Sequence, residues 1–148
     1  MALGKGQRIV AYDKIIAIHS RLDNRISYAL NVEKTSCGER ILQTAINCCA
    51  VSAYNDMQAT KARWGKTGGI LGYHLIHSYS PGEISPECAH ELGVEFARRL
   101  VGDRFEVVVG THTDHEHIHC HIIFNSVSFV DGSRFRSDYA AYYGSIRG

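Results

Sequence analysis

The sequence lacks several features that would assign it to a common class of protein. No run of eighteen apolar residues occurs in the 148-residue chain, so neither a transmembrane helix nor membrane insertion is expected. Residues 1–8 contain no apolar stretch, and no secretory signal is predicted. The five cysteines are odd in number and none stands in a CxxC spacing. That usage favours reduced cytoplasmic thiols over a disulfide framework.

Positive and negative side chains are almost equal in number, 16 Lys and Arg against 15 Asp and Glu. The formal net charge is +1 at pH 7, so composition alone does not indicate a nucleic-acid-binding protein. Local clusters of basic residues could still neutralise phosphates, although each cluster taken singly is also typical of a solvated surface. These clusters are Arg21 with Arg25, Lys61 with Arg63 and Lys66, and Arg134 with Arg136. Neither a P-loop nor a GxSxG nucleophile elbow is present.

Histidine, in contrast, is concentrated in one place. Five of the nine histidines lie in residues 112–121. If this stretch is a strand, successive side chains alternate between its two faces, and His117, His119 and His121 share one face. The other face then carries only apolar side chains, namely Ile118, Cys120, Ile122 and Phe124. The pattern predicts a strand with one buried face and a row of imidazoles on the other.

A second strand is predicted at residues 105–112, joined to the first by a short turn. In that register His112 lies opposite His117, and Gly110 lies opposite His119. Opposed Cβ atoms lie about 4.5–5.5 Å apart, so the imidazoles could converge on one metal ion at about 2.0–2.1 Å per nitrogen. The alternative is a polar face that binds nothing. The spacing itself chooses neither the ligands among these histidines nor the ion.

The rest of the chain alternates between predicted strands and helices. A capping serine followed by proline, Ser85-Pro86, begins the clearest helix, at residues 86–101. Asp23 is a candidate cap for a short helix at residues 24–30. The other predicted elements are strands at residues 15–19 and 72–80, a helix at residues 52–63, an ambiguous segment at residues 42–49, and an element beginning at residue 139. This order predicts an α+β fold, a central antiparallel β-sheet with helices packed on it. We expect residues 1–148 to form one domain at the N-terminus of a longer protein.

Three motifs stand in order along the chain. Residues 26–35 contain Tyr28, and residues 73–83 contain Ser78. The third motif reads His112-x-Asp114-x-x-His117-x-His119-x-His121-x-x-x-Asn125. Together they resemble the three motifs of conjugative and mobilisation relaxases, which are DNA-nicking enzymes of the HUH endonuclease superfamily, and in particular the MobA/VirD2-like relaxases. The similarity spans about residues 15–136, and its third motif is the most specific.

The resemblance implies a nucleophile. Tyr28 would attack a phosphate of single-stranded DNA at an origin of transfer, in a reversible step that leaves a 5′-phosphotyrosyl linkage and a free 3′-hydroxyl. A tyrosine hydroxyl has a pKa of about 10 in water, so the reaction needs a group that takes the proton. Asp114 and His117 are the candidates for catalytic proton transfer. Asp114 could instead orient His112, and His117 could be a spare ligand or a DNA contact.

The resemblance also implies a cofactor and partners. His112, His119 and His121 would bind a divalent ion, Mg²⁺ or Mn²⁺, with Zn²⁺ as an alternative. The expected DNA contacts are Ser78, Asn125, Arg25 and Lys66. Asn125, which lies on the same face of the predicted strand as the histidines, could instead hold the site. The partners would be single-stranded and hairpin DNA at the origin of transfer of a plasmid or integrative element, other relaxosome proteins and a coupling protein. The expected location is the bacterial cytoplasm.

The residues leave two other functions open. A metal-dependent phosphodiesterase that uses activated water would cleave its substrate without a covalent adduct and would tolerate the loss of Tyr28. A non-catalytic DNA-binding module with a structural metal would bind a hairpin oligonucleotide and never nick it.

Overall fold

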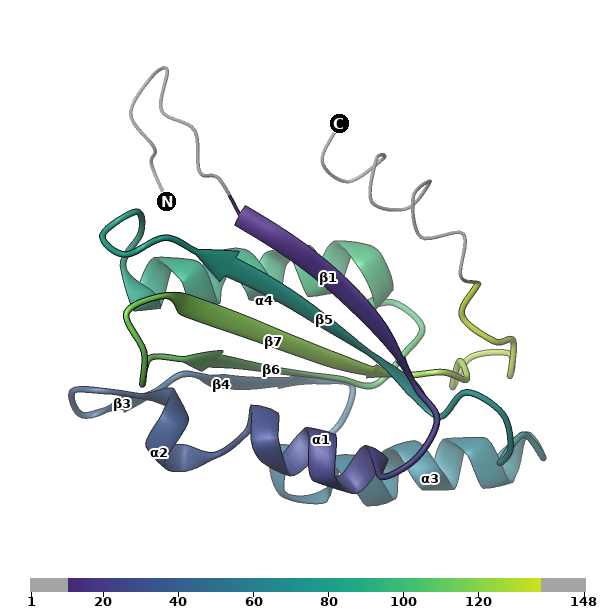
Figure 1. The fold of residues 1–148 in the computed structure, drawn as a ribbon. Coiled ribbons are helices and arrows are strands. Elements are labelled where there is room, and N and C mark those ends of the chain that lie inside the picture. The colour runs from purple at the N-terminus through teal and green to yellow at the C-terminus, as the bar shows by residue number, and fades with distance from the viewer. Residues whose placement is uncertain (1–10, 137–148) are drawn as a thin grey trace.

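The computed structural model describes residues 11–136 and builds them around one five-stranded antiparallel sheet. Its strand order is β1-β5-β7-β6-β4. The strands are β1 (Ala11–Ile18), β4 (Gln43–Ile46), β5 (Gly72–Tyr79), β6 (Val107–His112) and β7 (Ile118–Asn125). The histidine-bearing β7 is the middle strand, hydrogen-bonded to β5 on one side and to β6 on the other (Figure 1).

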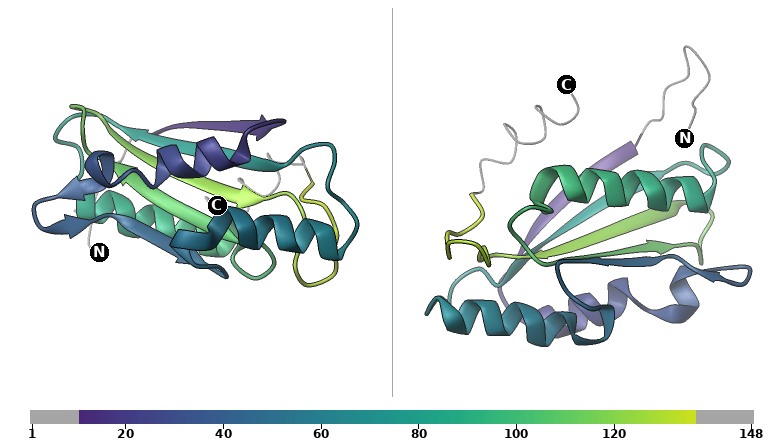
Figure 2. Two further views of the ribbon diagram at one scale, coloured as in Figure 1. Left: turned by 90° about the horizontal axis from the view of Figure 1, so that it is seen from below. Right: turned by 180° about the vertical axis from the view of Figure 1, so that it is seen from behind.

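Helices cover both faces of this sheet (Figure 2). The long helix α4 (Pro86–Val101) packs on one face, and α1 (Leu22–Ala29) and α3 (Ala53–Arg63) pack on the other. The connections add α2 (Val32–Thr35), a 3-10 helix (Ala50–Ser52) and a small hairpin of β2 (Ser36–Cys37) and β3 (Arg40–Ile41). The expected α+β class is confirmed. Within residues 11–136 no helix has the length and apolarity needed to cross a membrane.

The alternation read from the sequence sorts the core into two layers. Cys120, Ile122 and Phe124 of β7 are fully buried on the α4 side. Ile123, one residue out of phase, is buried on the opposite side against α1 and α3. Each large apolar side chain contributes roughly 1.5–3 kcal/mol when buried. The same alternation puts the histidines of β7 on the α1 side of the sheet.

The helix α4 begins and ends where the sequence predicts. Ser85 is the N-cap, and its side chain accepts a hydrogen bond from the backbone N–H of Cys88, with Pro86 in the first turn. Gly93 lets this helix lie close to the sheet, because a Cβ there would be 2.2 Å from the Cys120 sulfur. One face of β7 is thereby pressed against α4, and its histidine face is left for the site.

One local expectation needs correction, and one ambiguity is resolved. Asp23 does not cap α1. The N-cap is Arg21, in a left-handed conformation with φ 54° and no capping side-chain hydrogen bond, and Asp23 lies in the first turn beside it, 3.2 Å from its guanidinium. The ambiguous segment at residues 42–49 contains the edge strand β4. The element expected from residue 139 lies outside the described residues.

Candidate active site

Tyr28 lies in the last turn of α1, outside the helix face that packs on the sheet. Leu22, Ile26 and Ala29 are the buried residues of this helix, whereas Tyr28 is 46% exposed. Its ring meets those of two histidines edge-on, with centroids 4.9 Å from His112 and 5.4 Å from His121. The structure therefore brings the predicted nucleophile to the predicted ligands while leaving it accessible.

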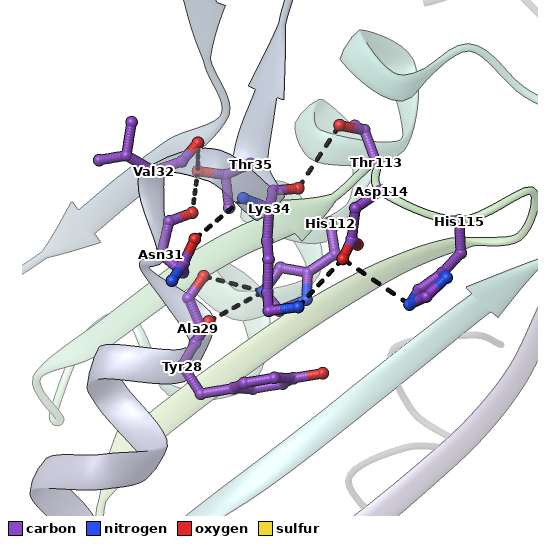
Figure 3. Close-up of polar contacts among 10 residues, drawn as sticks. All are labelled: Tyr28, Ala29, Asn31, Val32, Lys34, Thr35, His112, Thr113, Asp114 and His115. Carbon is purple, nitrogen blue, oxygen red and sulfur yellow. Dashed lines mark hydrogen bonds and ion pairs between the residues drawn. The ribbon is translucent and has the colours of Figure 1, made fainter.

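His112 holds the end of the helix that carries Tyr28. Its Nε2 lies 3.1 Å from the carbonyl oxygen of Tyr28 and 3.2 Å from that of Ala29 (Figure 3). Carbonyls only accept, so Nε2 carries the proton and donates to both. The Tyr28 carbonyl also accepts from the backbone N–H of Asn31, so His112 adds to the hydrogen bonds that close the end of the helix. Burial lowers the pKa of His112. The neutral ring then has its lone pair on Nδ1.

The histidine row exists, but in a register different from the expected one. His112 pairs with His119, and Gly110 pairs with His121. The ladder ends at the His112–His119 pair, and beyond it the N–H of Thr113 donates to the carbonyl of Lys34. The connecting loop is longer in consequence, and His117 lies exposed in it, outside the strand.

Each remaining histidine of the row is held by a residue of β5. Ser78 lies opposite His119, and its hydroxyl is 3.0 Å from Nδ1 of that ring. Nε2 of His74 lies 2.8 Å from Nδ1 of His121. Burial, followed by the charges of neighbouring histidines, lowers the pKa of both His119 and His121. The rings are therefore neutral near pH 7, the state in which imidazole binds metals.

A lysine and a carboxylate flank the tyrosine on its exposed side. Lys34 Nζ lies 5.5 Å from the centroid of the Tyr28 ring and 3.0 Å from the Asp114 carboxylate. His115 approaches the same carboxylate at 3.7 Å. The hydrogen bond that Lys34 donates to Asp114 raises the pKa of Lys34, so a full positive charge stands beside the phenol. Figure 3 shows Tyr28 projecting from α1 beneath this pair.

Comparison with known proteins identifies the family. A family model described as relaxase, MobA/VirD2-like, nuclease domain matches residues 28–147. The chain belongs to this family. It is 35% identical over 112 residues to the protein rlx of Staphylococcus aureus, a match that covers 76% of this chain and 34% of that protein. It is 42% identical over 86 residues to the group II intron-interrupted relaxase LtrB of Lactococcus lactis subsp. cremoris (strain MG1363), covering 54% and 15%. This relaxase nuclease domain spans about a third or less of the length of the curated relatives it matches.

The three histidines are suitable ligands for a divalent ion by their chemistry, but their rings are not arranged around one point. His112, His119 and His121 offer neutral imidazoles, and the ring centroids of His121 lie 4.1 Å from His112 and 6.3 Å from His119. Among residues 11–136, however, no three histidine, cysteine or acidic side chains are arranged to hold a metal as the rings now stand.

The residues expected at DNA separate into two groups. Arg25 lies at the site, with Nη1 3.1 Å from Nδ1 of His74, and Ser78 lies there as described. Lys66 donates to the carbonyl of Gly132, beyond the C-terminal end of β7. Asn125 is also at that end and fully buried. The structure does not bring these last two to the histidine row.

Asn125 connects charged groups inside the protein. Its amide donates to the Glu106 carboxylate at 2.9 Å and to the Met57 carbonyl at 3.1 Å, and its oxygen accepts from the Lys61 ammonium. Lys61 is itself fully buried, and burial lowers its pKa to about 8. Of the two roles expected for Asn125, contacting DNA or holding the site, these contacts favour holding.

Residues 115–119 also spell His-Glu-x-x-His, the letters of a zinc-peptidase motif that requires one helical face. They run through an exposed loop into β7, so that motif is not formed.

Two further residues of the site were not singled out from the sequence, Lys34 and His74. Both lie within the stretches that resemble relaxase motifs, and that position is the signal that could have found them.

Proposed function

We propose that this domain nicks single-stranded DNA at an origin of transfer, with Tyr28 as the nucleophile. The observation that carries the proposal is the position of Tyr28, half-exposed and in edge contact with His112 and His121. Membership of the relaxase nuclease family supports DNA as the substrate. A strand of DNA can reach the phenol from the solvent side, while the imidazoles approach the same phosphate from the sheet.

The proposed reaction exchanges one phosphodiester bond for another. The Tyr28 oxygen attacks the scissile phosphorus, the bond from phosphorus to the 3′ oxygen breaks, and the 3′ oxygen takes up a proton. The phenol proton passes to a base, for which Asp114 and His117 in the loop between β6 and β7 are the candidates. The DNA is left attached through a 5′-phosphotyrosine, and reversal of the step reseals the strand.

Lys34 has an electrostatic role in this proposal. Its ammonium lies beside the Tyr28 ring and is oriented by Asp114. A positive charge there favours the phenolate and the extra negative charge of the transition state, and its effect is larger once DNA excludes water. Lys34 would also attract the phosphate backbone before the reaction.

His112, His119 and His121 are the proposed metal-binding residues. A Mg²⁺ or Mn²⁺ ion, or Zn²⁺ as the alternative, would polarise a non-bridging phosphate oxygen and neutralise charge there. Ser78 would orient His119 through its hydrogen bond to Nδ1. We further propose that the whole protein acts on hairpin-containing origin DNA together with other relaxosome proteins and a coupling protein.

The test is adduct formation on a labelled single strand from the origin of transfer of the element that encodes the protein. With a divalent ion present, the wild type should give a protein–DNA band that survives denaturing electrophoresis, and Tyr28→Phe should give none. Tyr54→Phe is the matched control, because Tyr54 is also exposed but lies on α3. Cleavage without an adduct would indicate a phosphodiesterase that uses water, and binding without cleavage would indicate a non-catalytic module.

A further inference from the structure

Arg25 and His74 form a hydrogen-bonded chain that ends on His121. Nη1 of Arg25 lies 3.1 Å from Nδ1 of His74, and Nε2 of His74 lies 2.8 Å from Nδ1 of His121. His74 is 3% exposed and His121 is 5% exposed. These hydrogen bonds therefore lead from part-buried Arg25 on α1, through His74 on β5, to His121 on the central strand.

Arginine determines which atom is the donor in each of these two hydrogen bonds. A guanidinium has five N–H donors and no acceptor, so Nδ1 of His74 accepts and the ring proton is on Nε2. His74 then donates from Nε2 to Nδ1 of His121. A neutral His121 that accepts at Nδ1 carries its own proton on Nε2. Each ring has one proton, and Arg25 determines where both lie.

With the ring protons in these positions, His121 has no free nitrogen lone pair with which to bind a metal ion. A metal needs the lone pair of the nitrogen that it binds, yet Nε2 of His121 is protonated and Nδ1 is occupied by His74. To offer Nε2, His121 must move its proton to Nδ1 and donate to His74. The proton of His74 must then be on Nδ1, where it faces the guanidinium of Arg25. Two N–H groups cannot hydrogen-bond to each other, so Arg25 has to withdraw.

We propose that Arg25 and the metal ion exclude each other through the His74–His121 pair, so that metal binding releases Arg25 to bind a phosphate of the DNA. This inference rests on the proposed function, which makes His121 a metal ligand. His74 is the positioning residue that connects the two events. Arg25 lies one turn before Tyr28 on α1, so the released guanidinium stays beside the nucleophile, where the scissile strand has to lie.

The first test measures metal affinity in the absence of DNA, by calorimetric titration of Zn²⁺ or Mn²⁺ into the metal-free protein. Arg25→Ala should bind the ion about tenfold more tightly than the wild type, because the ion no longer competes with a hydrogen bond from a charged group. In a His74→Phe background the same Arg25 substitution should have no such effect.

The control for charge alone is Lys14→Ala. Lys14 is an exposed cation on β1, opposite Ile76, and its charge also lowers the pKa of His74. No hydrogen bond joins it to His74 in the described part of the chain. Equal gains in metal affinity from Lys14→Ala and Arg25→Ala would overturn the proposal, since repulsion between cations would then explain both.

The second test needs no variant. Nitrogen-15 NMR of the imidazole rings should find the His74 proton on Nε2 in the metal-free protein and on Nδ1 once zinc is bound. A proton that stays on Nε2 with zinc bound overturns the release of Arg25. If Tyr28 still forms its adduct in that case, the proposed function stands and only this inference fails. Failure of any metal to bind removes this inference together with the metal assignment.

Discussion

His112 donates from Nε2 to the main-chain carbonyl of Tyr28 across 3.1 Å. The strand that carries one predicted ligand thereby holds the end of the helix that carries the predicted nucleophile. Gly110, two residues earlier on β6, permits the approach, because a Cβ there would be 1.9 Å from the carbonyl oxygen of Ala29. Contacts between β6 and the main chain at the end of α1 therefore fix Tyr28 relative to the histidines.

Gly110→Ala should damage both stability and activity. The added methyl group meets backbone rather than a flexible side chain, so α1 has to shift, at a cost of about 1–3 kcal/mol in the free energy of unfolding. The rate of adduct formation should fall as well, because Tyr28 moves with the helix. Denaturant unfolding and initial rates measure the two effects. Gly68→Ala is the control, since a Cβ at Gly68 meets nothing within 4 Å. A wild-type nicking rate in Gly110→Ala would show that this close approach does not position the tyrosine.

Lys34→Met should slow nicking by about tenfold or more, which corresponds to ~1.4 kcal/mol in the barrier. Its stability should change little, because the Lys34–Asp114 pair is partly exposed and such pairs contribute about 0–1 kcal/mol. Single-turnover rates on an origin oligonucleotide measure the effect. Arg99→Met removes an exposed positive charge from α4, on the other face of the sheet. Equal losses of rate in the two variants would mean that general attraction of DNA, not the position of Lys34, is responsible.

The sequence predicted the features that depend on neighbouring residues. The apolar alternation of residues 118–124 placed one face of β7 in the core and left its histidines on the other face. The Ser85-Pro86 start located α4 to the residue. Both patterns are local, because a strand alternates every residue and a cap lies within one turn of its helix. The resemblance to relaxases supplied Tyr28, whose position beside the histidines the structure then revealed.

What the sequence did not predict depends on contacts between distant segments. In the observed register His112 lies opposite His119. Beyond that pair Thr113 donates to Lys34 of α2, and nothing in the hairpin itself encodes that contact. The pairing of Arg25 with His74 joins α1 to β5 across 49 positions of sequence. Asn125 was expected on the histidine face of β7, which is correct, but its burial comes from α3 packing over that end of the sheet.

Asn125→Leu should destabilise the fold by roughly 2–4 kcal/mol, because it leaves the buried Lys61 ammonium and Glu106 carboxylate without the amide that bridges them. Chemical denaturation measures the loss. Asn24→Leu, at an exposed position of α1, should cost much less. If Asn125 instead serves DNA directly, the variant will lose affinity for an origin oligonucleotide while keeping its stability, which is the opposite of the outcome expected here.

The metal-free domain should lose stability in mild acid. Burial, then the charge of Arg25, lowers the pKa of His74 from 6.5 to about 4. Between these values the unfolded chain binds a proton that the folded chain does not, so the free energy of unfolding falls as pH drops from about 6.5 to about 4. The share from His74 is at most about 3 kcal/mol. Denaturation curves across this range should be less pH-dependent for His74→Gln, whereas His19→Gln, at an exposed position, should behave as the wild type. Parallel curves for all three proteins would contradict the assignment.

The central claim is that Tyr28 forms the bond to DNA, and mass spectrometry of the purified adduct tests it most directly. Trypsin cleavage after Arg25 and Lys34 releases residues 26–34, in which Tyr28 is the only tyrosine. The account predicts that this peptide carries the 5′ phosphate of the cleaved strand. Attachment at any other residue, or cleaved DNA with no attached peptide, would contradict it.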